Sequence, residues 1–214
     1  MDRISTLFDS LDHWRHFPAY QLERRADIFF SLYLDEIFKS YFGENIGGVI
    51  PEFPVRKGSI QTNSESNRSF KIDYLVKLKN QNKVLLVELK TDSGSRRKNQ
   101  DRYLQEVKSV GFEKILQGVL MIYAATKAKS KYRCLLDELT SLGFLKKLPD
   151  HKYATDKTQC DIDIVYIQPE KKEGSMHVIS FQDIAEIVAR NSDELSQRFA
   201  ESLRQWAARK AGNY

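Results

Sequence analysis

The stretch Val84-Leu85-Leu86-Val87-Glu88-Leu89-Lys90 joins a run of strand-forming apolar residues to two charged ones. Successive side chains of a strand point to opposite faces, so Glu88 and Lys90 share one face. Both faces are apolar up to that point, which is typical of a strand buried inside a sheet. Charges on such a strand are costly unless they are paired or bind a metal ion. A similar run, Phe70 to Val76, comes before it, so the sequence predicts a hairpin that carries these charges.

The register of this hairpin decides which residues face the two charges. If Gln81-Asn82 form the centre of the turn, Asp73 lies opposite Lys90. If Asn80-Gln81 form it, Asp73 lies opposite Glu88. Either register brings the three charged residues to one face of the hairpin. A three-residue loop without a bulge would send Asp73 to the other face, because a slip of one residue reverses every side chain.

These residues resemble the core motif of the PD-(D/E)XK nuclease superfamily, which is an acid on one strand and acid-x-lysine on the next. Asp73 and Glu88-Leu89-Lys90 match it, and Ile72 stands at the place of the name-giving proline. The resemblance covers roughly residues 20 to 125. It implies a restriction-endonuclease-like fold, a three-layer α/β/α sandwich with a central mixed sheet whose antiparallel hairpin carries the site.

The same resemblance implies a metal-dependent nuclease that hydrolyses phosphodiester bonds, with DNA as the expected substrate. Mg²⁺ or Mn²⁺ would bind the carboxylates of Asp73 and Glu88, and the backbone carbonyl of Leu89 would be a further ligand. Lys90 would orient the attacking water or offset charge in the transition state. The alternative is a catalytically silent nucleic-acid-binding or assembly module, in which these charges form a structural ion pair.

The first long helix offers a further acid, which the superfamily often adds to its site. Residues Leu22 to Phe42 have apolar side chains at helical spacing, and Glu23, Asp27 and Glu36 lie at the margins of the apolar stripe. A helix rises about 1.5 Å per residue and a strand about 3.3 Å. If the strand Val49 to Arg56 runs back from the helix to the level of the hairpin, that level lies near the start of the helix. We therefore favour Glu23, then Asp27, then Glu36.

A basic helix is expected after the hairpin, with Ser95 as a candidate N-cap and residues from Arg96 to Gln105 in the helix. RecB-like nucleases place Q-x-x-x-Y here, whereas this chain has Gln100 and Tyr103, one residue closer together. Gln100 remains a candidate for positioning the substrate. Four basic residues are expected either to contact phosphates or to form a solvated face: Arg96, Arg97, Lys98 and Arg102.

The rest of the chain is consistent with one domain, residues 1–214, with a core of about 20–170 and closing helices within 181–210. The pattern predicts a strand over Gly118 to Ala125 and a helix over Lys131 to Leu142. It also predicts a strand over Asp161 to Gln168 and helices over Phe181 to Ala189 and Asp193 to Ala208. The polar segment from Arg56 to Arg68 is long for a connection, so it is expected to be a surface loop or a functional one.

Composition permits nucleic-acid binding without requiring it. The chain has 34 Lys and Arg against 29 Asp and Glu, a net charge of +5, and a pI near 9.0. Cys134 and Cys160 lack the spacing of a zinc or redox motif, and no Gly-rich phosphate loop or nucleophile elbow is present. His13 and His16 are expected to have surface or packing roles. Without a signal peptide or membrane-spanning run, a cytoplasmic protein is expected, and the resemblance makes a homodimer plausible.

Overall fold

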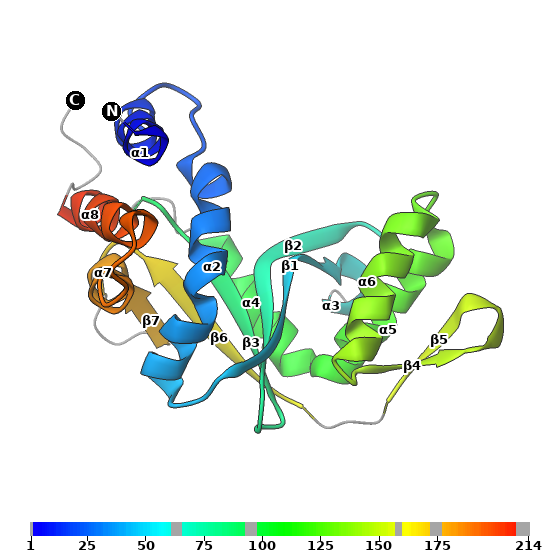
Figure 1. Ribbon diagram of the computed structural model, residues 1–214. Coiled ribbons are helices and arrows are strands. Elements are labelled where there is room, and N and C mark those ends of the chain that lie inside the picture. The colour runs from blue at the N-terminus through cyan, green and yellow to red at the C-terminus, as the bar shows by residue number, and fades with distance from the viewer. Residues whose placement is uncertain (1, 61–65, 93–97, 157–159, 172–176, 209–214) are drawn as a thin grey trace. The chain divides into compact units, whose positions relative to one another are not determined.

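A computed structural model describes residues 2–60, 66–92, 98–156, 160–171 and 177–208. They form a mixed α/β structure with a five-stranded sheet flanked by helices (Figure 1). The strand order is β1-β2-β3-β6-β7. β1 to β3 pair antiparallel, whereas β6 and β7 are parallel, so the sheet is mixed. These strands are β1 (Ile46–Arg56), β2 (Ser69–Leu78), β3 (Lys83–Leu89), β6 (Asp161–Gln168) and β7 (His177–Ser180).

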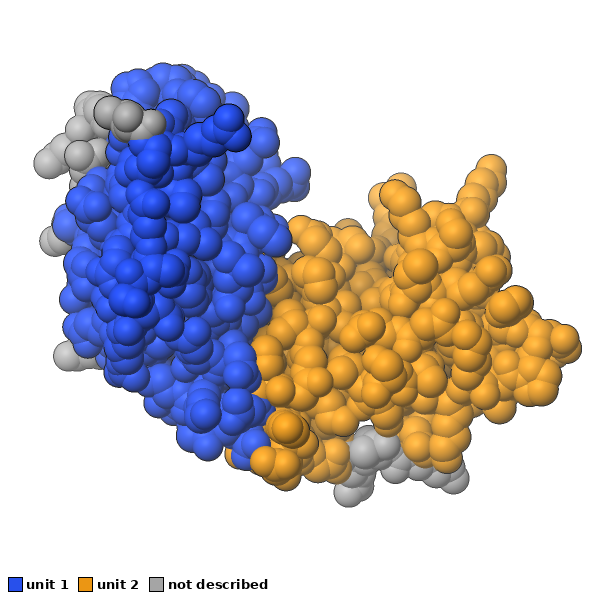
Figure 2. All heavy atoms as spheres, viewed as in Figure 1, with its two compact units in different colours: residues 1–45, 89–96, 165–214 blue, residues 46–88, 97–164 orange. Residues whose placement is uncertain are grey.

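The chain divides into two compact units, each assembled from segments that are distant in sequence (Figure 2). Unit 1 comprises Met1–Asn45, Leu89–Arg96 and Val165–Tyr214. Unit 2 comprises Ile46–Glu88 and Arg97–Ile164. The boundary between them therefore crosses β3 between residues 88 and 89, and β6 between residues 164 and 165.

The predicted hairpin is confirmed by β2 and β3. The pairs Tyr74–Val87 and Lys77–Val84 fix its register, which is the one that a turn centred on Asn80-Gln81 produces. One step further along this register, Asp73 stands opposite Glu88. All seven residues of β3 except the first are buried, as expected for a strand inside a sheet.

Unit 1 is built around helices that pack their aromatic faces together. Phe30 on α2 meets Phe199 on α8 with ring centroids 5.2 Å apart, and Phe8 on α1 lies 6.0 Å from Phe199. α2 ends at Gly43, whose φ of 71° is the left-handed conformation that commonly stops a helix. The helices of this unit are α1 (Arg3–Trp14), α2 (Leu22–Phe42), α7 (Phe181–Val188) and α8 (Glu194–Ala208).

Unit 2 packs its helices on β1 and on each other. α5 approaches α3 so closely that a Cβ at Gly118 would lie 2.3 Å from Oγ of Ser59, which requires glycine at that position. A separate two-stranded sheet pairs Leu145 with Thr155 and Leu148 with Lys152. The elements are α3 (Lys57–Ile60), α4 (Lys98–Val110), α5 (Phe112–Ala125), α6 (Lys129–Ser141), β4 (Leu145–Leu148), the 3-10 turn η1 (Pro149–His151) and β5 (Lys152–Thr155).

One predicted element is wrong, because residues Gly118 to Ala125 are the second half of helix α5 and not a strand. The buried side chains of α5 recur at helical spacing from its first residue: Phe112, Ile115, Leu116, Val119 and Ile122. The eight-residue apolar run at the end of this stripe, taken alone, fits a buried strand equally well. The period becomes visible only when the run is read together with the residues before it.

The other predicted elements agree with the structure to within a few residues. The helix Leu22–Phe42 and the strand Asp161–Gln168 have the expected bounds, and α6, α7 and α8 lie where helices were expected. In the polar connection, Lys57–Ile60 form one helical turn, and residues 61–65 lie outside the described ranges. Ser95, Arg96 and Arg97 also lie outside them. α1, α3, β4, β5 and β7 were not predicted.

Candidate active site

The candidate residues fall into two groups, one in each unit. Asp73, Glu88 and Gln100 belong to unit 2. Glu23 and the consecutive residues Leu89-Lys90 belong to unit 1. Each group has its own contacts, and together they include every acid, amide and lysine for which the sequence predicts a catalytic role.

The carboxylate of Glu88 is the most enclosed of these groups, with 1% of the residue exposed. Its Oε2 accepts a hydrogen bond from Nε2 of Gln100, and its Oε1 accepts one from the hydroxyl of Tyr103 at 3.1 Å. The two donors stand three residues apart on α4, so they lie on one face of the helix. Both are neutral. These bonds therefore satisfy the carboxylate oxygens without cancelling the negative charge.

Both acids of the hairpin affect the pKa of the Tyr103 phenol. Burial raises the pKa of Tyr103, and the negative charge of Glu88 raises it further, with a smaller contribution from Asp73. The phenol therefore keeps its proton throughout the neutral range and remains a donor to Glu88. Because the charge of Asp73 also reaches this phenol, the two carboxylates and Tyr103 belong to one electrostatic cluster. Asp73 itself is half-buried.

The unit 1 group centres on Lys90, of which 5% is exposed. Its Nζ lies 3.6 Å from Oε1 of Glu23, in the first turn of α2, and donates to the carbonyl of Leu89 at 2.8 Å. Its backbone N–H donates to the carbonyl of Ile167 at 2.8 Å, which holds the chain after the end of β3. Of the three candidate helix acids, Glu23 is thus the one that unit 1 brings to the lysine.

The other two helix acids have different contacts. A carboxylate oxygen of Asp27 accepts from the N–H of Ile28 at 2.7 Å, and Oε2 of Glu36 accepts from Nδ2 of Asn191 at 2.8 Å. The second bond places Glu36 against the turn after α7. The catalytic role of each of the three acids stays a prediction.

The predicted phosphate-binding residues are described only in part. Arg102 lies on α4 with 73% of its side chain exposed, and its Nε stands 3.9 Å from Glu106. Lys98 is the first residue of α4. Arg96 and Arg97 lie outside the described residues. Arg102 is thus accessible to a nucleic-acid backbone, while its neighbour Glu106 already balances part of its charge.

Tyr103 donates a hydrogen bond to Glu88, a role that the sequence analysis did not assign to it. The RecB-like pattern separates glutamine and tyrosine by four residues, and here they are separated by three. Positions three and four apart both lie on one helical face, and here both donors reach Glu88. The signal was present in the sequence as a polar pair at helical spacing, directly after the acidic strand.

The donor set suits a hard divalent cation, because carboxylate oxygens are the protein ligands that Mg²⁺ and Mn²⁺ prefer. Asp73 and Glu88 would supply them. Within the described ranges, no group of three or more His, Cys, Asp or Glu side chains is placed to hold a metal ion. A cation at these two acids would therefore need its remaining ligands from water, substrate phosphate or a backbone carbonyl, which is common for Mg²⁺. The carbonyl of Leu89, the further ligand expected from the sequence, accepts a hydrogen bond from Nζ of Lys90, and its role as a ligand stays a prediction.

His13 and the two cysteines have other surroundings. His13 packs its ring against Phe17 at 5.0 Å, which is a packing role. Both cysteines are free thiols. Burial raises the pKa of Cys160 to about 11, so its thiol is protonated at neutral pH and is a poor nucleophile.

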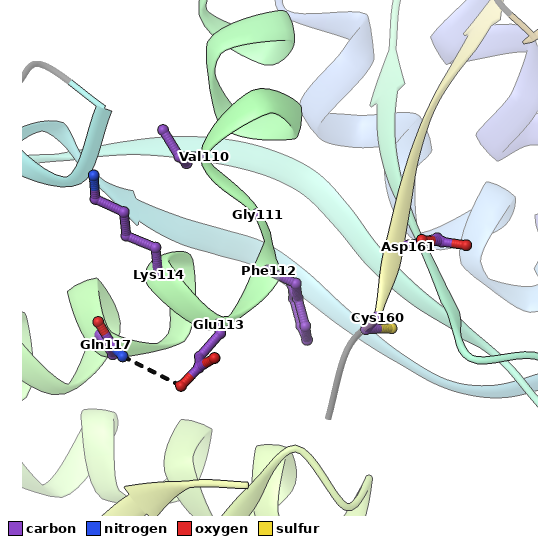
Figure 3. Close-up of a pocket in the computed structure, with 8 residues that line it drawn as sticks. All are labelled: Val110, Gly111, Phe112, Glu113, Lys114, Gln117, Cys160 and Asp161. Atoms are coloured by element: carbon purple, nitrogen blue, oxygen red, sulfur yellow. Dashed lines mark hydrogen bonds between the residues drawn. The ribbon is translucent and has the colours of Figure 1, made fainter. Parts of the chain in front are cut away.

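A cavity of about 630 Å³ lies in unit 2 where α4 passes into α5 (Figure 3). Val110–Lys114, Gln117, Cys160 and Asp161 line it, and Gln117 contacts Glu113 at 3.5 Å. None of the candidate catalytic residues is among these lining residues. The cavity therefore gives no support to a small-molecule reaction at Glu88.

Comparison with protein-family models, with curated proteins and with solved structures gives no significant match. The function must therefore be argued from the two groups of residues and their chemistry. A buried carboxylate with neutral donors and a second acid opposite it can attract a cation. A nearly buried lysine beside an acid can donate hydrogen bonds to an anion or to water.

Proposed function

We propose that this protein is a metal-dependent nuclease that hydrolyses phosphodiester bonds in DNA, on a restriction-endonuclease-like fold. The observation that carries the proposal is the environment of Glu88. Its buried carboxylate accepts from two neutral donors on α4, and continuing the register of the hairpin by one pair beyond Tyr74–Val87 reaches Asp73 and Glu88. Two acids on adjacent strands and a lysine two residues after the second acid are the residue types that this reaction needs.

The roles of the chain's own residues follow from their donors and acceptors. Asp73 and Glu88 would hold Mg²⁺ or Mn²⁺, which when bound supplies a Lewis acid for a phosphate oxygen and favours the ionised form of water. Gln100 and Tyr103 keep the Glu88 carboxylate fixed. Lys90 donates hydrogen bonds that orient water or offset negative charge at the phosphate. Glu23 orients the ammonium of Lys90.

The alternative function is a catalytically silent module that binds nucleic acid or another protein. One observation favours it, because protein groups already contact both oxygens of Glu88 and the ammonium of Lys90. In that case the acids would serve the stability of the hairpin, and nucleic acid would bind without a divalent cation. The two functions thus differ in their requirement for metal.

The test is a cleavage assay on labelled linear, circular, single-stranded and branched DNA, with Mg²⁺, Mn²⁺ or EDTA. Wild type is compared with Asp73→Asn and Glu88→Gln, which remove a charge and keep the shape. The matched control is Glu106→Gln, because Glu106-Val107-Lys108 repeats the acid-x-lysine pattern on an exposed helix face.

We expect metal-dependent cleavage by wild type and by Glu106→Gln, and a loss of about 100-fold or more in the two site variants. Cleavage that survives in Glu88→Gln would show that the site is wrong. DNA binding without cleavage, equal in metal and in EDTA, would favour the silent module.

A further inference from the structure

Three side chains of unit 2 form a row that ends at Glu88. They are Lys57, Phe70 and Tyr103, and we call them the stacked row. The rings of Phe70 on β2 and Tyr103 on α4 are parallel to within 1°, with centroids 4.7 Å apart. Nζ of Lys57, on α3, lies 4.8 Å from the centroid of the Phe70 ring. The hydroxyl of Tyr103 donates to Glu88 at 3.1 Å. The row thus joins three elements of unit 2 to the acid.

Stacking on Phe70 restricts the rotation of the Tyr103 side chain that would break its hydrogen bond to Glu88. A tyrosine hydroxyl stands at the far end of the ring, so a rotation of the side chain about its first torsion moves it by several ångströms. A parallel neighbour at van der Waals distance opposes that rotation. The cation above the Phe70 ring adds an attraction that keeps Phe70 in place.

Packing alone is an incomplete explanation for this stack. Phe70 and Tyr103 are both only half-buried, whereas the core aromatic residues of unit 2, such as Phe53 and Phe112, are almost fully enclosed. The partially exposed pair also has a polar end, because the Tyr103 hydroxyl is directed at a buried acid. A contact of this kind controls the orientation of a carboxylate more than it adds to the core.

We propose that Phe70 is a positioning residue that acts through Tyr103 to hold the Glu88 carboxylate in the orientation that binds the catalytic cation. This inference rests on the proposed function for the identity of the ligand, a divalent cation. It assigns to Phe70 a role that neither the charge pattern of the hairpin nor the spacing on α4 indicates.

The experiment measures Mn²⁺ affinity by titration calorimetry in wild type, Phe70→Leu, Tyr103→Phe and the double variant. We expect Phe70→Leu to raise the dissociation constant about fivefold, since losing the support of a ligand weakens metal binding. The double variant should bind no more weakly than Tyr103→Phe alone, because Phe70 acts only through the phenol. Phe70→Tyr keeps the stack and should keep the affinity.

The control is Phe112→Leu, which removes a ring from an edge contact with Phe144 at 4.8 Å in the same unit. It should lower stability and leave the Mn²⁺ dissociation constant unchanged. If Phe70→Leu changes the affinity no more than this control does, or if its effect persists in full in the Tyr103→Phe background, the inference is overturned.

A second measurement needs no metal, and it separates failure of this inference from failure of the proposed function. Urea unfolding of wild type, Phe70→Leu, Glu88→Gln and the double variant gives the coupling between Phe70 and Glu88. We expect non-additivity of about threefold or more in the unfolding equilibrium constant, and its loss in the Tyr103→Phe background. Additive effects overturn the inference. Coupling in a protein that binds no Mn²⁺ supports the Phe70 contact and overturns the metal-dependent function.

Discussion

The two groups of candidate residues hold their charges in opposite ways. In unit 2, the buried carboxylate of Glu88 is held by an amide and a phenol, which leave its charge uncompensated by these contacts. In unit 1, the ammonium of Lys90 stands 3.6 Å from the carboxylate of Glu23, whose side chain is 34% exposed. The donors from α4 hold the carboxylate of Glu88 without cancelling its charge, whereas Glu23 gives Lys90 a counter-charge. We therefore expect unit 2 to set metal affinity and unit 1 to set the rate.

The largest effect expected from this difference is that of Lys90→Ala. Removing the ammonium should lower single-turnover cleavage of DNA by about 100-fold, because it deletes a donor at the place where charge develops. The Mn²⁺ dissociation constant should change by less than about twofold, since the donors to Glu88 remain. Lys79→Ala, in the exposed turn of the same hairpin, is the control. An equal loss of metal affinity and rate would remove the distinction between the two groups.

The second prediction concerns Gln100, which supports the acid from α4. Gln100→Ala should weaken Mn²⁺ binding about tenfold, because the carboxylate loses one of the two donors that fix it. The rate at saturating Mn²⁺ should remain close to that of wild type. Asn99→Ala, at an exposed position of the same helix, should bind like wild type. A reduced rate at saturating metal with unchanged affinity would place Gln100 with the substrate instead.

A smaller effect is expected at Glu23. Its ion pair with Lys90 is partly exposed, so Glu23→Gln should lower cleavage by about threefold, in keeping with the modest strength of such pairs. The Mn²⁺ dissociation constant should not change. Asp27→Asn, one turn along α2, tests the second-ranked acid in the same assays. A tenfold or larger loss of affinity in Glu23→Gln would show that this acid is a metal ligand and not a partner of the lysine.

The sequence predicted best where a pattern is local. The alternation in β2 and β3 predicted the hairpin, and the structure has the register in which the turn is centred on Asn80-Gln81, one of the three that the sequence left open. The amphipathic stripe of α2 gave its bounds. In each of these cases the geometry follows from the spacing of residues in the sequence.

The sequence predicted poorly where the outcome depends on packing between elements. The strand β4 has two consecutive lysines, Lys146 and Lys147, and only Leu145 of the strand is buried. Apolar and polar residues therefore do not alternate along β4. The stack of Phe70 on Tyr103 depends on how α4 is rotated against β2, which no spacing within either element reveals. The helix α5 was taken for a strand because its apolar run matches both periods over eight residues.

The last prediction concerns a charged cluster of unit 2 in which lysines cancel the charge of an acid, to be compared with the neutral donors from α4 at Glu88. Asp163 on β6 accepts from Nζ of Lys83 at 2.9 Å and of Lys108 at 3.0 Å, with 20% of its side chain exposed. Burial alone would raise the pKa of Asp163, but the hydrogen bonds from Lys83 and Lys108 prevail and lower the pKa below its ordinary value of 3.8.

Because the pKa of Asp163 is lower in the folded state, the cluster stabilises the protein above pH 3.8 and loses this contribution as the pH falls through the folded value. Asp163→Asn should therefore lower the free energy of unfolding by about 1 kcal/mol at pH 7, a figure that allows for screening by solvent. The difference from wild type in urea unfolding should shrink below pH 3.8. Asp161→Asn, at an exposed position on the same strand, should show little change. A loss that persists at low pH would mean that packing, and not charge, accounts for the cluster, and the contrast with Glu88 would then have no electrostatic basis.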